Sequence, residues 1–191
     1  MVDSQFTVFG NKYRMGSYIL FIRISSPFQL AFGKFQQSRL FTIPESDYLY
    51  IGSALGGNKS GNPLARRLIR HASRSDGKAP HEIRAALINF FSKDDIALKN
   101  AIKPSTKKIH WHIDYLLDRP EAAISHIMMI RSPMKMERKL SELLESLHET
   151  SMLAPRLGAQ DTPNSTHLLQ ITDKTTILYI LRKEIPLLLS P

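Results

Sequence analysis

The sequence contains no cysteine in its 191 residues. Without thiols the chain cannot form a disulfide or a thiolate metal site, so any bound metal would need carboxylate, imidazole or water ligands. This composition is compatible with the cytosol.

Long apolar runs are also absent. The first 20 residues lack the usual apolar core of a signal sequence, and the longest apolar runs fall short of the roughly 20 residues that a membrane span needs. We therefore expect a soluble, cytoplasmic protein with no membrane partner.

Acidic residues are scarce relative to basic ones. The chain has 17 Asp and Glu against 26 Lys and Arg, a net charge of +9. Such a charge attracts polyanions, so nucleic acid is the leading class of partner, although a merely soluble basic protein has the same composition. With 42% hydrophobic and 23% charged residues, we expect one packed domain, with or without an appendage.

The first half of the chain indicates a β-meander. Residues 1–15 are a tail or a loose extra strand, and the run GSYILFIRI from Gly16 predicts a buried strand at the centre of a sheet. The stretches FQLAFGKF, RLFTI and DYLYIGSA then follow as short β-like segments between polar or proline breaks.

Helices are predicted in the second half. Pro63 is placed to open a helix through LARRLIRHASR, in which Leu64, Leu68 and His71 share one face. Residues 73–107 contain two short helical patterns, HEIRAALINFF and DDIALKNAI, and are treated as an insertion or lid. AAISHIMMI is a predicted strand.

The clearest helix is predicted to begin at Ser132 and Pro133. Glu137 borders its apolar stripe in the first turn. Residues 173–191 are predicted to be a strand and an apolar tail, because THLLQI and TTILYIL suggest a hairpin before PLLLSP. The stripe consists of Met136, Leu140, Leu143, Leu144 and Leu147.

The order of motifs resembles the GIY-YIG nuclease superfamily: GSY, about thirty residues, YLYIGSA, a basic helix, and later a helix that carries Glu137. The run HWHIDYL at residues 110–116 resembles more closely a branch of small archaeal and bacterial proteins, sometimes joined to endonuclease III. The likeness spans roughly residues 16–170. Residues 158–168 lack the cysteines expected there, and the insertion is longer than the usual link.

This resemblance implies an α/β (α+β) fold, a small mainly antiparallel sheet flanked by helices, over residues 16–172. It also implies a divalent-metal-dependent endonuclease that hydrolyses DNA phosphodiester bonds in repair or processing, with Mg²⁺ or Mn²⁺ as cofactor. RNA is not excluded as substrate, because phosphate contacts carry little sequence information.

Tyr18 and Tyr50 come from two strands that are expected to be neighbours, so their phenols can meet and orient or deprotonate a water. The resemblance makes one of them the base and leaves open which. The alternative is that both are core aromatics of the sheet.

The other catalytic candidates lie on the two predicted helices. Arg67 aligns with the family's arginine, whose planar fork suits a phosphate, and His71 either assists proton transfer or positions substrate. Glu137 is the expected metal ligand, because Mg²⁺ commonly takes one or two carboxylates and otherwise water and phosphate oxygens. The alternative for Glu137 is an ordinary helix N-terminal carboxylate.

Further polar residues are weighed as a binding surface or a second site. His110, His112 and Asp114 form either a secondary polar site or a structural network, and no spacing among them is diagnostic of zinc. His167 and Asp161 are discounted as polar supports. The predicted nucleic-acid-binding residues are Arg66, Arg70, Arg74, Lys107 and Lys108.

Two other hypotheses remain. The first is a non-catalytic nucleic-acid-binding module of the same fold. The second is an assembly component or homodimer that associates through the apolar C-terminal residues Leu187, Leu188 and Leu189.

Overall fold

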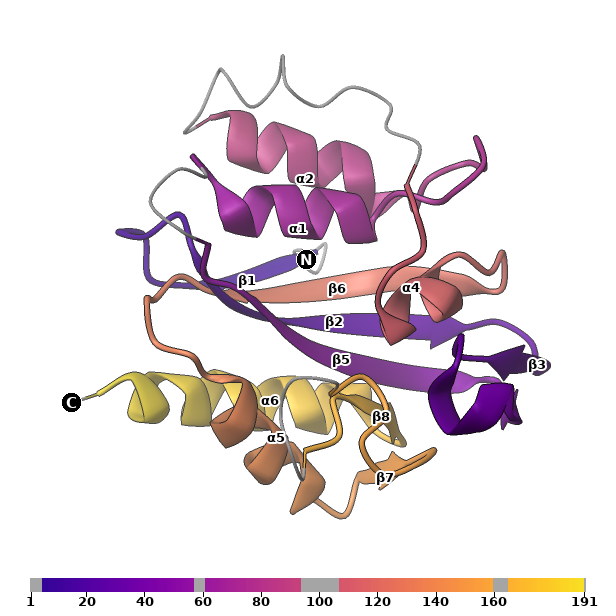
Figure 1. Ribbon diagram of the computed structural model, residues 1–191. Coiled ribbons are helices and arrows are strands. Elements are labelled where there is room, and N and C mark those ends of the chain that lie inside the picture. Colours follow the sequence, from indigo (N-terminus) through magenta and orange to yellow (C-terminus); the bar gives the residue numbers. More distant parts are fainter. Residues whose placement is uncertain (1–4, 57–60, 94–106, 160–164, 191) are drawn as a thin grey trace.

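The computed structural model describes residues 5–56, 61–93, 107–159 and 165–190, and shows a six-stranded sheet with helices on both faces (Figure 1). The strand order is β1-β6-β2-β5-β8-β7, and every pairing is antiparallel except that of β1 with β6. The predicted α/β class with a small, mainly antiparallel sheet is thus confirmed. The strands of this sheet are β1 (Phe6–Phe9), β2 (Gly16–Ile24), β5 (Ser46–Ala54), β6 (Ala122–Ile130), β7 (Thr150–Met152) and β8 (Leu168–Ile171).

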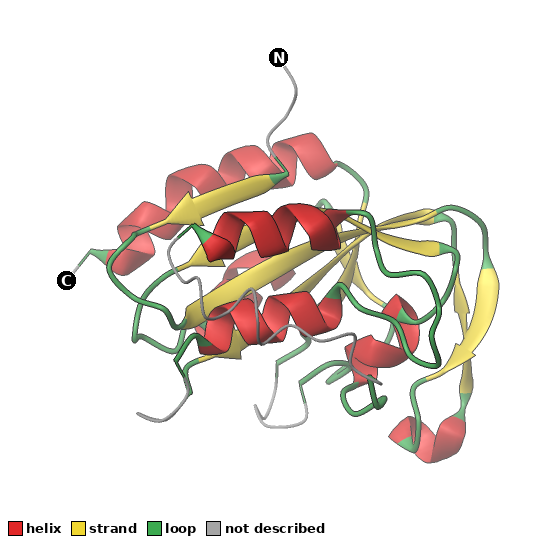
Figure 2. Cartoon of the chain, turned by 90° about the horizontal axis from the view of Figure 1, so that it is seen from above, coloured by secondary structure: helices red, strands yellow, loops and turns green. Residues whose placement is uncertain are grey.

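A second, two-stranded sheet pairs β3 (Phe28–Ala31) with β4 (Leu40–Ile43). Figure 2 shows this hairpin, with the short 3-10 helix η1 (Phe35–Ser38) between its strands, at one end of the molecule. The α-helices among the described residues are α1 (Pro63–His71), α2 (Ile83–Ser92), α4 (His112–Leu117), α5 (Glu137–Glu145) and α6 (Lys174–Leu189).

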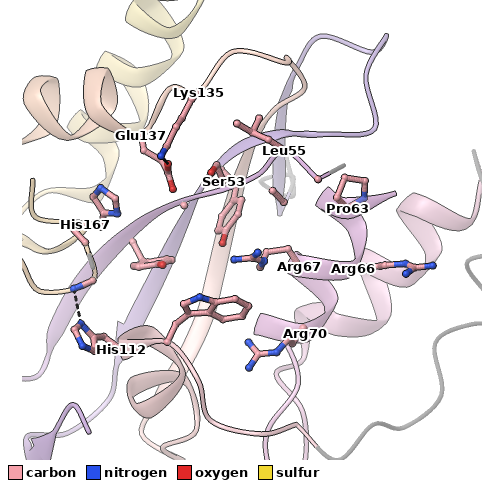
Figure 3. A pocket seen from close by; sticks show the side chains of 18 residues that line it. Ser53, Leu55, Pro63, Arg66, Arg67, Arg70, His112, Lys135, Glu137 and His167 are labelled. Atoms are coloured by element: carbon pink, nitrogen blue, oxygen red, sulfur yellow. Dashed lines mark hydrogen bonds and ion pairs between the residues drawn. The ribbon is translucent and has the colours of Figure 1, made fainter. Parts of the chain in front are cut away.

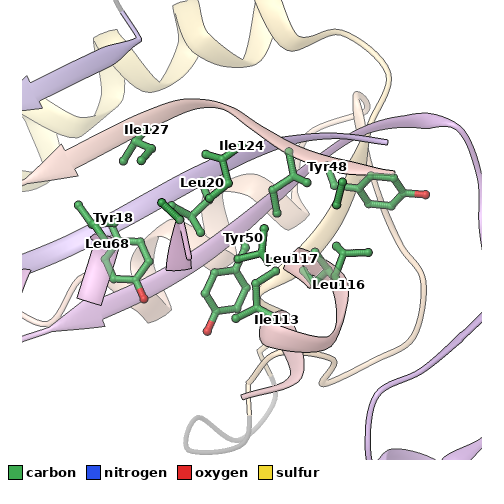
Figure 4. Packing of buried hydrophobic residues seen from close by; sticks show 14 of the residues in the cluster. Tyr18, Leu20, Tyr48, Tyr50, Leu68, Ile113, Leu116, Leu117, Ile124 and Ile127 are labelled. Carbon is green, nitrogen blue, oxygen red and sulfur yellow. The ribbon is translucent and has the colours of Figure 1, made fainter. Parts of the chain in front are cut away.

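Strand β2 lies between β5 and β6 at the centre of the large sheet, as its apolar sequence predicts. Its side chains alternate between two cores, because successive residues of a strand point to opposite faces. Tyr18 and Leu20 pack toward α1, α2 and α4 (Figure 4). Ile19 and Phe21 pack on the opposite face, toward α5 and α6. The sheet is therefore the middle layer of a three-layer arrangement.

Helix α1 begins where the sequence predicts. Pro63 occupies the first turn, and the Asn62 side chain caps the helix by accepting a hydrogen bond of 3.1 Å from the Ala65 amide. Leu64, Leu68 and His71 are all buried. The capped end and the buried face fix the direction in which the basic side chains of α1 project.

The predicted strand at the C-terminus is wrong. Residues 174–189 form helix α6, which Asp173 caps by accepting hydrogen bonds from the amides of Thr175 and Thr176. Ile177, Leu181 and Ile185 recur every four residues and are buried against the sheet. This helical spacing outweighs the β-branched content of TTILYIL.

Two other boundaries differ from the prediction. Helix α5 begins at Glu137 and not at Ser132 or Pro133, because the Met136 amide is held by the Ser17 hydroxyl at 3.2 Å and residues 131–136 are irregular. The N-terminal segment is an ordered strand, β1, beside β6, which confirms the alternative of an extra strand.

The insertion is partly described. Its first helical pattern forms α2, which packs through Ile83, Leu87 and Phe91 into the core beside α1. The second pattern, at residues 94–102, lies outside the described residues. A search of the described residues finds no helix long and apolar enough to cross a membrane.

Candidate active site

A pocket of about 620 Å³ opens at one end of the sheet, between α1, the segment before α4, the start of α5 and the residues Gly158, Ala159 and His167 (Figure 3). Tyr18, Tyr50, Arg67 and Glu137, which the sequence analysis singled out, all line it. The charged residues of the lining are four cations and one carboxylate: Arg66, Arg67, Arg70, Lys135 and Glu137.

The two tyrosines come from neighbouring strands, as expected. In the β2–β5 register Tyr18 faces Gly52 and Leu20 faces Tyr50, so the tyrosines are diagonal neighbours with ring centroids 6.5 Å apart. A Cβ atom on Gly52 would lie only 2.5 Å from Cζ of Tyr18. Gly52, the glycine of the YIG motif, therefore leaves the room that the Tyr18 ring needs.

His71 connects Tyr18 to a buried carboxylate. The Tyr18 hydroxyl lies 2.8 Å from Nε2 of His71, and Nδ1 of His71 lies 3.7 Å from Oδ1 of Asp114. With the Nδ1 proton facing Asp114, Nε2 carries the lone pair and the phenol donates to it. Burial lowers the pKa of His71 to about 4 and raises the pKa of Tyr18 well above its ordinary value. Both groups are neutral in the resting protein.

Asp114 lies at the centre of a buried network. It accepts two hydrogen bonds from the Arg70 guanidinium, at 3.0 and 2.8 Å, and two from the amides of His110 and Trp111, at 3.0 Å each. Burial alone would raise the pKa of Asp114, but the neighbouring His71 ring, the hydrogen bonds from Arg70 and the charge of Lys107 lower it well below its ordinary range. This anion ties α1 to α4, as the structural alternative predicted.

Trp111 holds two of the three pocket arginines of α1 in place. The Cζ atoms of Arg67 and Arg70 lie 4.0 and 4.2 Å from the centroid of the Trp111 rings. The charge of Arg67 opposes the effect of burial on the pKa of Tyr18. The Arg67 guanidinium is thus oriented by an aromatic face before any ligand binds.

The carboxylate side of the pocket is formed by Glu137 and His167. Glu137 is the first residue of α5, its side chain is 13% exposed, and it forms an ion pair of 3.5 Å with Lys135. In Figure 3 Glu137 and His167 come from different segments and face the same space. A carboxylate so placed can hold a hard cation, and the described residues contain no group of three or more His, Cys, Asp and Glu suited to a metal.

Several predicted binding residues have roles within the protein. Arg74 donates to the backbone carbonyls of Leu117, Ala79 and Ala122. Lys107 is buried, donates to the Ser73 carbonyl at 2.9 Å and lies 3.4 Å from Asp114. We therefore correct the prediction that these two cations bind nucleic acid, because their charges are used in internal contacts.

The remaining predicted residues divide between the pocket and its margin. Arg66, Arg70 and His112 line the pocket, and Nδ1 of His112 accepts a hydrogen bond of 3.3 Å from the Gly158 amide. Lys108 and His110 are exposed residues of the segment before α4 and do not line it. Asp161 lies outside the described residues.

Sequence reasoning missed the roles of Trp111, Lys135 and His167. Trp111 and Lys135 were given no role in the site, and His167 was discounted as a polar support. The available signal for His167 was its position directly before the apolar strand β8. Because β8 pairs with β5, a residue at that end of β8 lies beside β5.

The chain matches the model of a protein family. Its model, described as Domain of unknown function DUF123, aligns with residues 17–188. No curated protein and no solved structure matches significantly. The match covers all the pocket residues named above.

Proposed function

The chain belongs to the DUF123 family, whose description states no activity, and from the geometry of the pocket we propose that it is a divalent-metal-dependent endonuclease of the GIY-YIG type acting on DNA phosphodiester bonds. The observation that carries this proposal is the convergence of a tyrosine pair, an oriented arginine and a single carboxylate on one basic pocket. These four side chains come from β2, β5, α1 and α5.

The charge of the pocket supports a phosphate ligand. Arg66, Arg67 and Lys135 line the pocket, and Arg67 is oriented by Trp111, so that its planar fork is available to two oxygens of one phosphate. Positive charge fixed before binding stabilises the negative charge that develops on phosphoryl oxygens during hydrolysis. Arg67 is the proposed transition-state clamp.

The base is proposed to be Tyr18, supported by His71 and Asp114. The phenol proton can move to Nε2 of His71, at 2.8 Å, as the phenol oxygen takes a proton from the attacking water. Burial opposes the charges that develop during this transfer, but Arg67 stabilises transient negative charge on the phenol oxygen, and Asp114 stabilises the imidazolium that remains on His71. Tyr50 completes the wall on which the water is oriented.

Glu137 would hold the divalent cation. A single carboxylate at an open pocket suits Mg²⁺, which keeps several waters and takes phosphate oxygens from its substrate. When bound, such a cation supplies Lewis-acid stabilisation of the phosphate and the leaving oxygen.

The test is cleavage of labelled duplex, branched and single-stranded DNA, and of RNA, with Mg²⁺, Mn²⁺ or EDTA. We expect metal-dependent cutting by the native chain, and a loss of about 100-fold or more for Tyr18→Phe, Arg67→Ala and Glu137→Gln. Arg138→Ala is the matched control, because Arg138 carries the same charge as Arg67 but is exposed beside Glu142 on α5.

Two outcomes would overturn the proposal. Cutting that survives in Arg67→Ala and Glu137→Gln would place the activity elsewhere or in a contaminant. Binding of DNA without any cutting by the native chain would favour the non-catalytic binding module, for which the same basic pocket would serve.

A further inference from the structure

His167 has a nitrogen that nothing in the described part of the chain uses. The residue is 4% exposed, yet its Nε2 atom has no hydrogen-bond partner among the described residues. A buried imidazole nitrogen without a partner costs free energy, so such an atom calls for an explanation. It belongs to a side chain that lines the pocket beside Glu137 (Figure 3).

The Gly158 backbone lies directly beside His167, because a Cβ atom added to Gly158 would be 3.2 Å from the His167 Cβ. In the tautomer that carries its proton on Nδ1, the ring can donate to a backbone carbonyl and Nε2 is left with a lone pair. Nε2 is the ring nitrogen that has no partner among the described residues.

This arrangement is the one that metal-binding histidines adopt. A ligating histidine usually donates its second ring N–H to a carbonyl or carboxylate, which sets the ring orientation and directs the lone pair at the metal. Gly158 is suited to this contact because its φ of +86° is strained for other residues, and a Cβ atom there would lie 3.2 Å from both the His167 Cβ and Tyr50.

The backbone of His167 is held rigidly. Its amide donates to Leu157 at 3.0 Å and its carbonyl accepts from Ile51 of β5 at 2.9 Å. The preceding amide, of Thr166, donates to Glu145 at 2.7 Å. Because Glu145 ends the same helix that Glu137 begins, α5 positions both the carboxylate and the imidazole.

We propose that Nε2 of His167 and the carboxylate of Glu137 form a mixed nitrogen and oxygen site for a divalent transition metal of the Mn²⁺, Co²⁺ or Zn²⁺ class. Imidazole suits these ions, whereas Mg²⁺ prefers oxygen ligands alone. The inference rests on the proposed function, in that Glu137 is the carboxylate ligand of the cation. Water and substrate oxygens complete the coordination.

The experiment measures metal binding to the full, untagged chain without nucleic acid. Co²⁺ is titrated and followed by its visible absorption, and Mg²⁺ is titrated by calorimetry. We expect His167→Gln to weaken Co²⁺ binding at least 10-fold while Mg²⁺ binding changes less than 2-fold, and Glu137→Gln to weaken both. His148→Gln, on an exposed histidine after α5, is the matched control and should bind Co²⁺ like the native chain.

A second measurement does not depend on any variant folding. Long-range ¹H–¹⁵N spectra of the imidazole rings should show His167 as the Nδ1–H tautomer at neutral pH, and Zn²⁺ should shift its Nε2 resonance. Equal Co²⁺ affinity of the native chain and a folded His167→Gln, or an Nε2 resonance that Zn²⁺ leaves unchanged, would overturn the proposal.

The two proposals fail separately. A chain that binds Co²⁺ through His167 but cuts no nucleic acid would retain the mixed site and refute the nuclease. A chain that cuts with Mg²⁺ and whose Co²⁺ affinity is indifferent to His167→Gln would retain the nuclease and refute the mixed site.

Discussion

At the scale of single residues, Gly52 shows how closely the pocket is fitted. Gly52→Ala would place a methyl group 2.5 Å from Cζ of Tyr18, so the ring must move away from His71. We expect a loss of about 1–3 kcal/mol in the free energy of unfolding, typical of overpacking. Urea unfolding should detect it. Gly61→Ala is the control, because no described residue lies within 4 Å of its added Cβ, and a similar loss there would contradict the argument.

The sequence predicted the pocket residues that lie on regular elements. Tyr18, Tyr50 and Arg67 could be identified because GSY, YIG and the basic helix occur in the order that resembles the GIY-YIG pattern. Lys107 could not be assigned correctly, since a lysine in a polar stretch has the pattern of a surface residue and only the buried Asp114 carboxylate explains its burial. The free nitrogen of His167 likewise depends on a contact with Gly158 that spacing does not reveal.

At the scale of elements, Asp114 joins α1 to α4. Removing its charge with Asp114→Asn leaves Arg70 and the buried Lys107 without a counter-charge, so we expect a loss of roughly 3–5 kcal/mol in the free energy of unfolding. Chemical denaturation measures this. Glu142→Gln, in an exposed ion pair with Arg138, should cost less than about 0.5 kcal/mol. Equal losses in the free energy of unfolding for the two variants would show that the Asp114 network stabilises the protein no more than an exposed ion pair does.

Helix α6 shows where element prediction failed. The run TTILYIL contains β-branched residues and follows a strand after a short turn, which is a hairpin pattern. Asp173 as a cap and the four-residue spacing of Ile177, Leu181 and Ile185 were the competing signals. They prevail because the sheet face formed by Ile19 and Phe21 needs a long apolar cover, and a single strand cannot supply one.

At the scale of the whole molecule, stability should depend on pH. Burial lowers the pKa of His71 to about 4 and that of His81 to about 3, against 6.5 for an exposed histidine. At pH values between 6.5 and the lowered pKa of each ring, the unfolded chain binds more protons than the folded chain. The contribution of each histidine to stability is therefore fully present above pH 6.5 and is lost as the pH falls. Each histidine should remove roughly 2 kcal/mol between pH 6.5 and 4.5, at about 1.4 kcal/mol per pH unit.

Urea unfolding at pH 7.5, 6.5, 5.5 and 4.5 measures this dependence. The slope of stability against pH should be smaller in His81→Gln than in the native chain, whatever the absolute stability of the variant. His148→Gln should leave the slope unchanged, because His148 is exposed. Identical slopes in all three proteins would show that the buried His81 ring is not responsible.

The assembly hypothesis gains little from the C-terminal residues. Leu188 and Leu189 are partly buried against the core beneath α6, and Leu187, at 66% exposed, stands out as the exposed member of the three. A single exposed leucine is ordinary for a monomer surface, so it gives no particular reason to expect association through this end, which stays a hypothesis.

Strand β1 has a consequence for how the protein stays in solution. It runs parallel to β6. Phe9, and Gln5 just before the strand, accept hydrogen bonds from the amides of Arg131 and Ile127. The family match begins only at residue 17, so this strand is an addition to the matched region. Without it, the nine-residue apolar strand β6 would be the edge of the sheet and open to pairing with another chain; β1 moves the edge to a strand of only four residues, which offers less backbone for such pairing and so opposes aggregation.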